Sequence, residues 1–162
     1  MDKKEQFISA IKDNEGFIYK LAHAYTNTPE DRHDLVQEIF YQLWKSFGSY
    51  AGKAALGTWI YRVALNVAIY QLRKNRKQVR VVPLNESTLE LADSHSMQEE
   101  NWKLFRQQID ELNLLDKGIV LLYLDNKTHE EIAAVTGLSK TNVGTRLARI
   151  KEKLKQEITK KI

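Results

Sequence analysis

The residues whose types and spacing indicate a specific chemistry lie near the end of the chain, between positions 128 and 154. The sequence predicts a short helix, a three-residue turn at Gly137-Leu138-Ser139 and a longer basic helix. Two helices joined in this way make a helix-turn-helix, whose second helix enters the major groove of DNA. At about 100° per residue, four apolar residues of the second helix share one face and are expected to point inward: Val143, Leu147, Ile150 and Leu154.

The opposite face of that second helix carries short polar side chains and one arginine. An arginine can hold a guanine edge with two hydrogen bonds, and a threonine can contact a base or a thymine methyl. Polar side chains flanking them suit backbone phosphates. The expected base contacts are Thr141, Thr145, Ala148 and Arg149, and the expected phosphate contacts are Asn142 and Arg146. The alternative is a helical hairpin with a solvated basic face.

A second segment, residues 59–80, combines aromatic rings with positive charge. Trp59, Tyr61 and Tyr70 are interleaved with apolar residues and the polar Asn66, and five basic residues follow Gln71. Rings on which bases stack, beside cations that meet phosphates, are typical of proteins that bind single-stranded or opening DNA. The glycine-rich residues 48–57 just before could form a loop that accepts an extruded base. An amphipathic core helix with a solvated tail explains the segment equally well.

A third segment, residues 34–44, has an apolar stripe wider than a contact between two helices requires. Asp34, Gln37, Glu38 and Tyr41 form a polar edge beside this stripe. A wide apolar stripe with a polar edge suits a face that binds a partner protein. Plain core packing is the alternative.

Local signals predict where the helices that carry these residues begin and end. Thr28 precedes Pro29 as a helix cap, and Thr58 is expected to cap a helix from Trp59 to about residue 77. Two capping boxes start at Ser96 and Thr128, each with a glutamate three residues later. Gly137 is expected to adopt the left-handed turn conformation. No strand signal is convincing, so the predicted fold class is all-α.

Charge divides the chain of 162 residues, whose net charge is +4, into three parts. Residues 1–80 carry 13 basic and 8 acidic side chains, residues 81–100 carry 5 acidic and no basic ones, and residues 101–162 carry 12 basic and 8 acidic ones. The middle part also contains Pro83, several small polar residues and weak periodicity, which mark a linker. We expect two small helical domains, residues 1–80 and 101–162, joined by an acidic linker, residues 81–100.

Composition excludes several classes of function. The absence of cysteine excludes disulfides, thiolate metal sites and a cysteine nucleophile. The longest apolar run, residues 119–124, is far shorter than the roughly 20 residues that span a bilayer. The N-terminus has no signal peptide, so a cytoplasmic protein is expected. The four histidines are scattered without ligand spacing, and we expect no metal, no cofactor and no catalytic residues.

With these three segments in this order, the chain resembles the extracytoplasmic-function (ECF, group IV) sigma factors of bacterial RNA polymerase over about residues 7–158. DLVQEIFYQLWKSF and GTWIYRVALNVAIYQLRKNRK resemble sigma region 2, and THEEIAAVTGLSKTNVGTRLARIKEKL resembles the region 4 helix-turn-helix. The resemblance implies a non-catalytic subunit that directs promoter recognition, −10 melting and transcription initiation. It implies three kinds of partner: core RNA polymerase (the β′ clamp helices and the β flap), promoter DNA, and an anti-sigma factor, in this family often membrane-anchored. The chain itself is not expected to insert into a membrane.

Carried over by position, the resemblance implies three sets of contact residues. The core-polymerase set is Asp34, Gln37, Glu38 and Trp44. The −10 DNA set is Tyr50, Lys53, Trp59, Arg62, Asn66, Arg73, Lys74, Arg76 and Lys77, with Asn66 receiving the flipped base. The −35 DNA set is the helix face given above, from Thr141 to Arg149. Ala51-Gly52-Lys53 replaces the family's usual Arg-Gly-acid sequence, and Gly144 stands where an Arg or Lys is common.

Two other classes of function remain as alternatives. An autonomous helix-turn-helix regulator would bind duplex DNA as a dimer, but the first domain offers no evident dimer seam or ligand pocket. A metal phosphohydrolase is suggested by the dipeptide His33-Asp34. That chemistry needs further His and Asp ligands on facing helices, and the sequence does not supply them.

Overall fold

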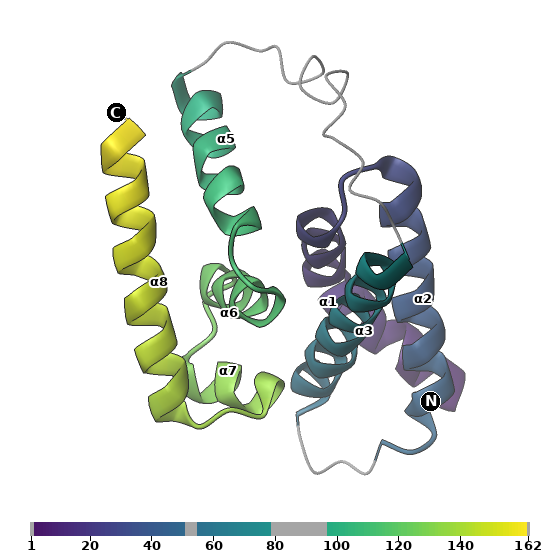
Figure 1. Cartoon of the computed structure of the whole chain (residues 1–162). Coiled ribbons are helices and arrows are strands. Elements are labelled where there is room, and N and C mark those ends of the chain that lie inside the picture. The colour runs from purple at the N-terminus through teal and green to yellow at the C-terminus, as the bar shows by residue number, and fades with distance from the viewer. Residues whose placement is uncertain (1, 51–54, 79–96, 162) are drawn as a thin grey trace.

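The computed structural model describes residues 2–50, 55–78 and 97–161, and this part of the chain contains helices and no strand. Figure 1 shows the helices in two groups that lie side by side, one from each end of the chain. The first group is α1 (Lys3–Tyr25), α2 (Pro29–Phe47) and α3 (Leu56–Gln78). The second is α5 (Met97–Asp110), α6 (Leu114–Leu124), α7 (His129–Thr136) and α8 (Lys140–Lys161). The all-α prediction is confirmed.

Side-chain caps fix the starts of α2 and α6, and the cap of α2 is the one that the sequence predicts. The Thr28 hydroxyl accepts a hydrogen bond from the Asp31 N–H at 3.1 Å, with Pro29 at the first helical position. At the start of α6, the side chain of Asn113 accepts from the Asp116 N–H at 2.8 Å. These side chains satisfy N–H groups that have no partner within the helix.

The predicted start of α3 is wrong. The sequence placed the cap at Thr58, whereas α3 begins at Leu56. The Trp59 N–H donates to the Ala55 carbonyl at 3.0 Å, so Thr58 already lies within the first helical turn and is not the cap. Leu56 and Trp59 both pack against the core, and this burial outweighs the preference of threonine for a cap position.

The last residues of the segment expected as linker are helical. Helix α5 begins at Met97, so residues 97–100 belong to α5. This is the helix start that the capping-box pattern at Ser96 indicates, but Ser96 itself lies outside the described residues.

A single apolar core joins the two groups of helices. From the first group it contains the fully buried Ile18, Leu21 and Leu65, and from the second the fully buried Ile119 and Ile132. A smaller cluster packs α5 and α6 against α8 within the second group: Ile109, Leu112, Val120 and Ile150. The two groups are therefore packed against each other through buried side chains. No helix in the described ranges is long and apolar enough to cross a membrane.

Candidate nucleic-acid interface

The helix-turn-helix is built from α7, the turn at residues 137–139 and α8. The Thr128 hydroxyl accepts from the Glu131 N–H at 3.1 Å, and the Glu131 carboxylate accepts from the Thr128 N–H at 3.1 Å, so the capping box is confirmed. These hydrogen bonds to Thr128 lower the pKa of Glu131. Gly137 ends α7 with a φ of +81°, in the left-handed conformation expected for it. The Ser139 hydroxyl then accepts from the Asn142 N–H at 3.0 Å in the first turn of α8.

The inward face of α8 is the one that the sequence predicts. Val143, Leu147 and Ile150 are buried, and Leu154 is partly buried against the smaller cluster. Burial of this stripe holds α8 against α6 and α7 and leaves the opposite face in solvent. The four expected base contacts all lie on that exposed face: Thr141, Thr145, Ala148 and Arg149.

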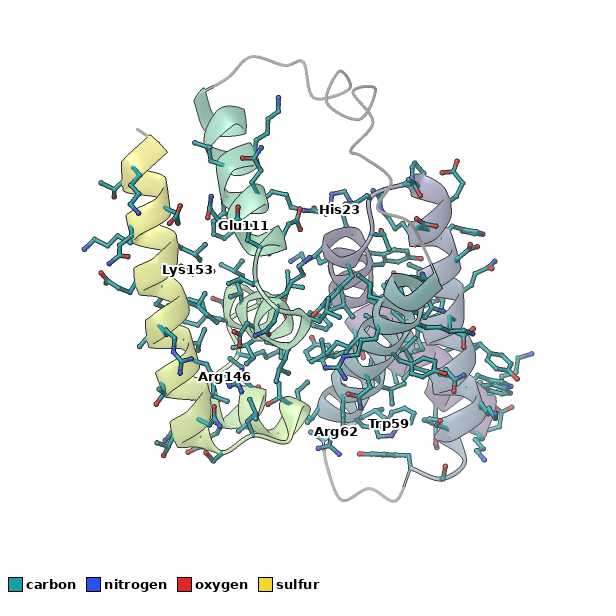
Figure 2. All side chains as sticks on the ribbon, in the orientation of Figure 1. His23, Trp59, Arg62, Glu111, Arg146 and Lys153 are labelled. Atoms are coloured by element: carbon teal, nitrogen blue, oxygen red, sulfur yellow. The ribbon has the colours of Figure 1, made fainter. Side chains whose placement is uncertain are left out.

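The two expected phosphate contacts are engaged within the protein. Arg146 donates from Nε to the Asn142 Oδ1 at 2.8 Å and from Nη1 to the Asp116 Oδ1 at 3.0 Å. Asp116 lies in the first turn of α6, so Arg146, which is labelled on α8 in Figure 2, ties α8 to α6. Sequence reasoning missed this ion pair because Asp116 is 30 residues away.

Gly144 lies against the first residue of α7. A Cβ at this position would be 3.5 Å from Nδ1 of His129, which is ordinary van der Waals contact. Gly144 therefore faces α7, and the exposed face of α8 is formed by residues on either side of it, such as Thr141 and Thr145.

The second basic segment forms α3, and its expected DNA contacts share a stripe. At about 100° per residue, Trp59, Arg62, Asn66, Tyr70 and Arg73 lie on one side of the helix. Asn66, Arg73 and Tyr70 are exposed, Tyr70 to 67% of its surface. Lys74 is exposed beside the stripe.

Three other expected −10 contacts lie wholly or partly outside the described residues. Lys53 lies outside the described residues. Arg76 and Lys77 lie in α3, but their side chains fall outside the described part.

A chain of aromatic rings holds Trp59 at one end of this stripe. The Trp59 ring lies 5.3 Å from Tyr50 and 6.2 Å from Phe47, between centroids. Phe7 of α1 packs edge-on against both Phe47 and Trp44, at 5.3 and 5.1 Å. Tyr50, an expected −10 contact, is therefore positioned by a tilted ring contact with Trp59, with 46° between the ring planes. Phe7 of α1 thus joins the rings of α2, of which Phe47 contacts Trp59 in the stripe of α3.

The expected partner-binding face lies on α2. Asp34 and Gln37 are exposed, while the Glu38 carboxylate accepts from the Gln42 amide at 2.9 Å. Trp44 and Tyr41 are exposed to 52% and 56% of their surface on the same side of the helix. Exposed apolar patches on a protein surface are typical of sites that bind a partner, so this side of α2 is a candidate for such a site. Tyr41 was read from the sequence as part of the polar edge, and the structure makes it a main apolar element of this face.

The fold and these surfaces define a helical DNA-binding protein with a helix-turn-helix at one end and an aromatic and basic helix at the other. Sigma-70 region 2 matches residues 10–78, and sigma-70 region 4 matches residues 102–154. The chain belongs to the sigma-70 family, in its ECF group.

Known relatives match the sequence of this chain along nearly its whole length. RNA polymerase sigma factor SigV of Bacillus subtilis (strain 168) is 28% identical over 158 residues, which cover 97% of this chain and 93% of SigV. ECF RNA polymerase sigma factor SigW of the same organism is 26% identical, over 87% of this chain and 82% of SigW. The fold is also that of the sigma factor RpoE from Bartonella quintana, solved in complex with the anti-sigma factor NepR. That match has a TM-score of 0.68 at 17% identity and covers 96% of both chains.

Proposed function

We propose that this chain is a promoter-specificity subunit of bacterial RNA polymerase: it binds core polymerase and directs promoter recognition, −10 melting and transcription initiation. The observation that carries this proposal is the presence of both sigma regions, in order, on one chain that covers nearly all of SigV. An autonomous helix-turn-helix regulator does not account for the region 2 match. The chain acts without catalytic residues of its own, in the cytoplasm where RNA polymerase works.

Three surfaces carry out separate parts of this function. The face of α2 with Asp34, Gln37, Glu38 and Trp44 binds core polymerase through the β′ clamp helices. The stripe of α3, from Trp59 to Lys77 and with Tyr50 and Lys53 before it, opens and holds the −10 element. The exposed face of α8, with Thr141, Thr145, Ala148 and Arg149, reads the −35 element, and the second domain contacts the β flap.

An anti-sigma factor is the proposed regulator of this chain. RpoE of Bartonella quintana, which shares the fold, was solved in complex with the anti-sigma factor NepR. The exposed aromatic side chains of α2 offer such a partner an apolar surface.

Binding to core polymerase tests the first surface. The variant Trp44→Ala removes a ring that is half exposed, so its effect on the fold is small and its effect on a buried interface is large. We expect core polymerase affinity to fall at least about tenfold, which corresponds to about 1.4 kcal/mol. Tyr19→Ala is the matched control, because Tyr19 of α1 is 49% exposed, contacts one ring as Trp44 does, and lies outside the three proposed surfaces. Equal affinity of the Trp44 variant and the parent for core polymerase would contradict the assignment of this face.

A further inference from the structure

The first turn of α1 lies against the end of α2, where the chain enters the glycine-rich residues 48–57. Phe7 packs edge-on against Phe47, the last residue of α2, with 5.3 Å between the ring centroids. Lys3 precedes Phe7 by four residues, so it lies on the same side of α1, one turn nearer the start. Figure 1 shows the N-terminus beside this end of α2. Packing of Phe7 on Phe47 therefore fixes where Lys3 meets the chain that leaves α2.

Gly48 leaves the space that the ammonium group of Lys3 occupies. A Cβ at position 48 would lie 2.9 Å from Nζ of Lys3 and 3.8 Å from its Cε, so a side chain there would displace the ammonium group. The backbone of Gly48 has φ −63° and ψ −26°, which any residue adopts. What the glycine provides here is therefore room for the cation rather than an unusual backbone conformation.

Capping of α2 does not account for this placement of Lys3. A cation near the end of a helix can bind the last carbonyl groups, which have no partner within the helix. At the end of α2, the Ser46 carbonyl already accepts from the N–H and the hydroxyl of Ser49, at 3.0 and 2.9 Å. The Phe47 carbonyl accepts from the Tyr50 N–H at 3.2 Å. The turn after α2 thus supplies the hydrogen bonds that a capping lysine would give.

The charge of Lys3 is not neutralised by the described part of the chain. Lys3 is exposed, and its Nζ forms no hydrogen bond or ion pair with another described residue. The carboxylate beside it in sequence, that of Asp2, accepts from the Glu5 N–H at 2.8 Å as the cap of α1. An exposed ammonium group that is held in place and lacks an acidic partner is available to an anion.

Two aromatic rings lie just beyond this ammonium group along the chain. Tyr50 follows Gly48 by two residues, and its ring lies 5.3 Å from that of Trp59. Proteins that bind single-stranded DNA combine rings on which bases stack with cations that meet the phosphates. The start of α1 therefore adds a cation to the aromatic side of the proposed −10 site.

We infer that Lys3 is a further −10 contact and that its ammonium group binds a backbone phosphate of the opened strand, next to the base that residues 48–57 accept. This inference rests on the proposed function, because it takes the −10 site as given there. The −10 contacts assigned from the sequence all lie in α3 or in the connection before it. Lys3 reaches the same place from the opposite end of the domain.

Binding of a fork-junction DNA to the polymerase that carries this chain tests the inference. The probe has a single-stranded −10 region and comes from a template on which the parent initiates transcription. The variant is Lys3→Ala, and Lys3→Arg keeps the charge. Lys12→Ala is the matched control, because Lys12 is an exposed lysine of the same helix, nine residues later and so on its opposite side.

We expect Lys3→Ala to bind the probe about three- to fivefold more weakly, the range for an exposed pair of opposite charges. The slope of log affinity against log salt should become shallower by about 0.7, the value for one phosphate contact on a single strand. Lys3→Arg and Lys12→Ala should both keep the affinity and the slope of the parent.

Probes with one methylphosphonate at a time locate the contact. This replacement removes the charge of a single phosphate. The parent should lose affinity at one position beside the extruded base, and Lys3→Ala should lose nothing more at that position, because the cation that pairs with it is already absent.

Two outcomes would overturn the inference while the proposed function stands. In the first, Lys3→Ala keeps the affinity, the slope and the methylphosphonate pattern of the parent, whether or not urea unfolding shows a loss of stability at the end of α2. In the second, Lys12→Ala changes the slope as much as Lys3→Ala does, so that only the overall charge matters. A parent that binds neither core polymerase nor any fork junction would overturn the proposed function, and the inference with it.

Discussion

The ion pair between Arg146 and Asp116 is predicted to position α8, the second helix of the helix-turn-helix. Arg146→Ala removes a contact at 3.0 Å between two side chains that are 29% and 18% exposed. Hydrogen bonds to charged groups contribute about 1.5–3 kcal/mol, and partial exposure reduces this. We expect the free energy of unfolding to fall by about 1–2 kcal/mol, which is a tenth or more of the stability of an ordinary domain.

A double-mutant cycle isolates the pair from the other roles of Asp116. Asp116→Ala also removes a negative charge from the first turn of α6, where it interacts favourably with the helix dipole. We expect the two changes together to cost less than their sum, with a coupling energy of about 1 kcal/mol. Urea unfolding monitored by circular dichroism gives all three values. Lys153→Ala, an exposed residue of the same helix, is the control and should change stability by no more than about 0.5 kcal/mol.

DNA binding provides the second arm of this test. An arginine that contacts a phosphate reduces the salt dependence of affinity by about one unit when it is removed. An Arg146 held by Asp116 should leave that slope unchanged while lowering stability. A coupling energy near zero, together with a reduced slope, would refute the positioning role and assign Arg146 to a phosphate instead.

Two further predictions concern the core and alkaline pH. Leu147→Ala should lower the free energy of unfolding by about 2–5 kcal/mol, because Leu147 is only 2% exposed. Leu124→Ala is the control and should have little effect, because Leu124 is 50% exposed. Denaturant unfolding compares the two variants, and equal losses of stability would show that α8 is not packed as described. Burial and the neighbouring Asp125 raise the pKa of Tyr61 to about 12, and burial also raises the pKa of Tyr25. Because only the neutral form is favoured in the fold, this stability is complete below pH 10 and is lost as the pH rises from 10 through the folded pKa values. Tyrosine ionisation followed by ultraviolet absorbance should lag behind that of a denatured sample, and Tyr61→Phe should remove a step near pH 12.

Local signals in the sequence were sufficient to predict the helix-turn-helix. Thr128 and Glu131 cap α7, Gly137 adopts a positive φ, and Val143 and Leu147 are buried, because each of these features depends on residues within a few positions of one another. The start of α3 was not predictable in this way. It depends on packing of Leu56 and Trp59 against helices that are distant in sequence.

The contacts between the domains left no readable pattern in the sequence. Arg62 and Ala134 are 72 positions apart, and Tyr25 and Leu114 are 89 positions apart. Gly118 directly precedes the apolar run 119–124, where a glycine only weakens the predicted helix. Its close contact with Leu65 and Tyr25 became visible only in the structure.

The contact sets for polymerase and DNA remain predictions. Trp44, Asn66 and Arg149 are all exposed and available for a partner. Their roles depend on a complex that the free chain does not contain.

In-vitro run-off transcription tests the central claim most directly. The chain is added to sigma-free core polymerase from a related bacterium, on a library of genomic promoters, beside Asn66→Ala, Arg149→Ala and the exposed control Lys155→Ala. We predict specific initiation at a subset of templates with the parent and the control, weaker −10 opening with Asn66→Ala, and relaxed −35 preference with Arg149→Ala. Absence of transcripts, with no co-migration of the chain with core polymerase, would contradict the account.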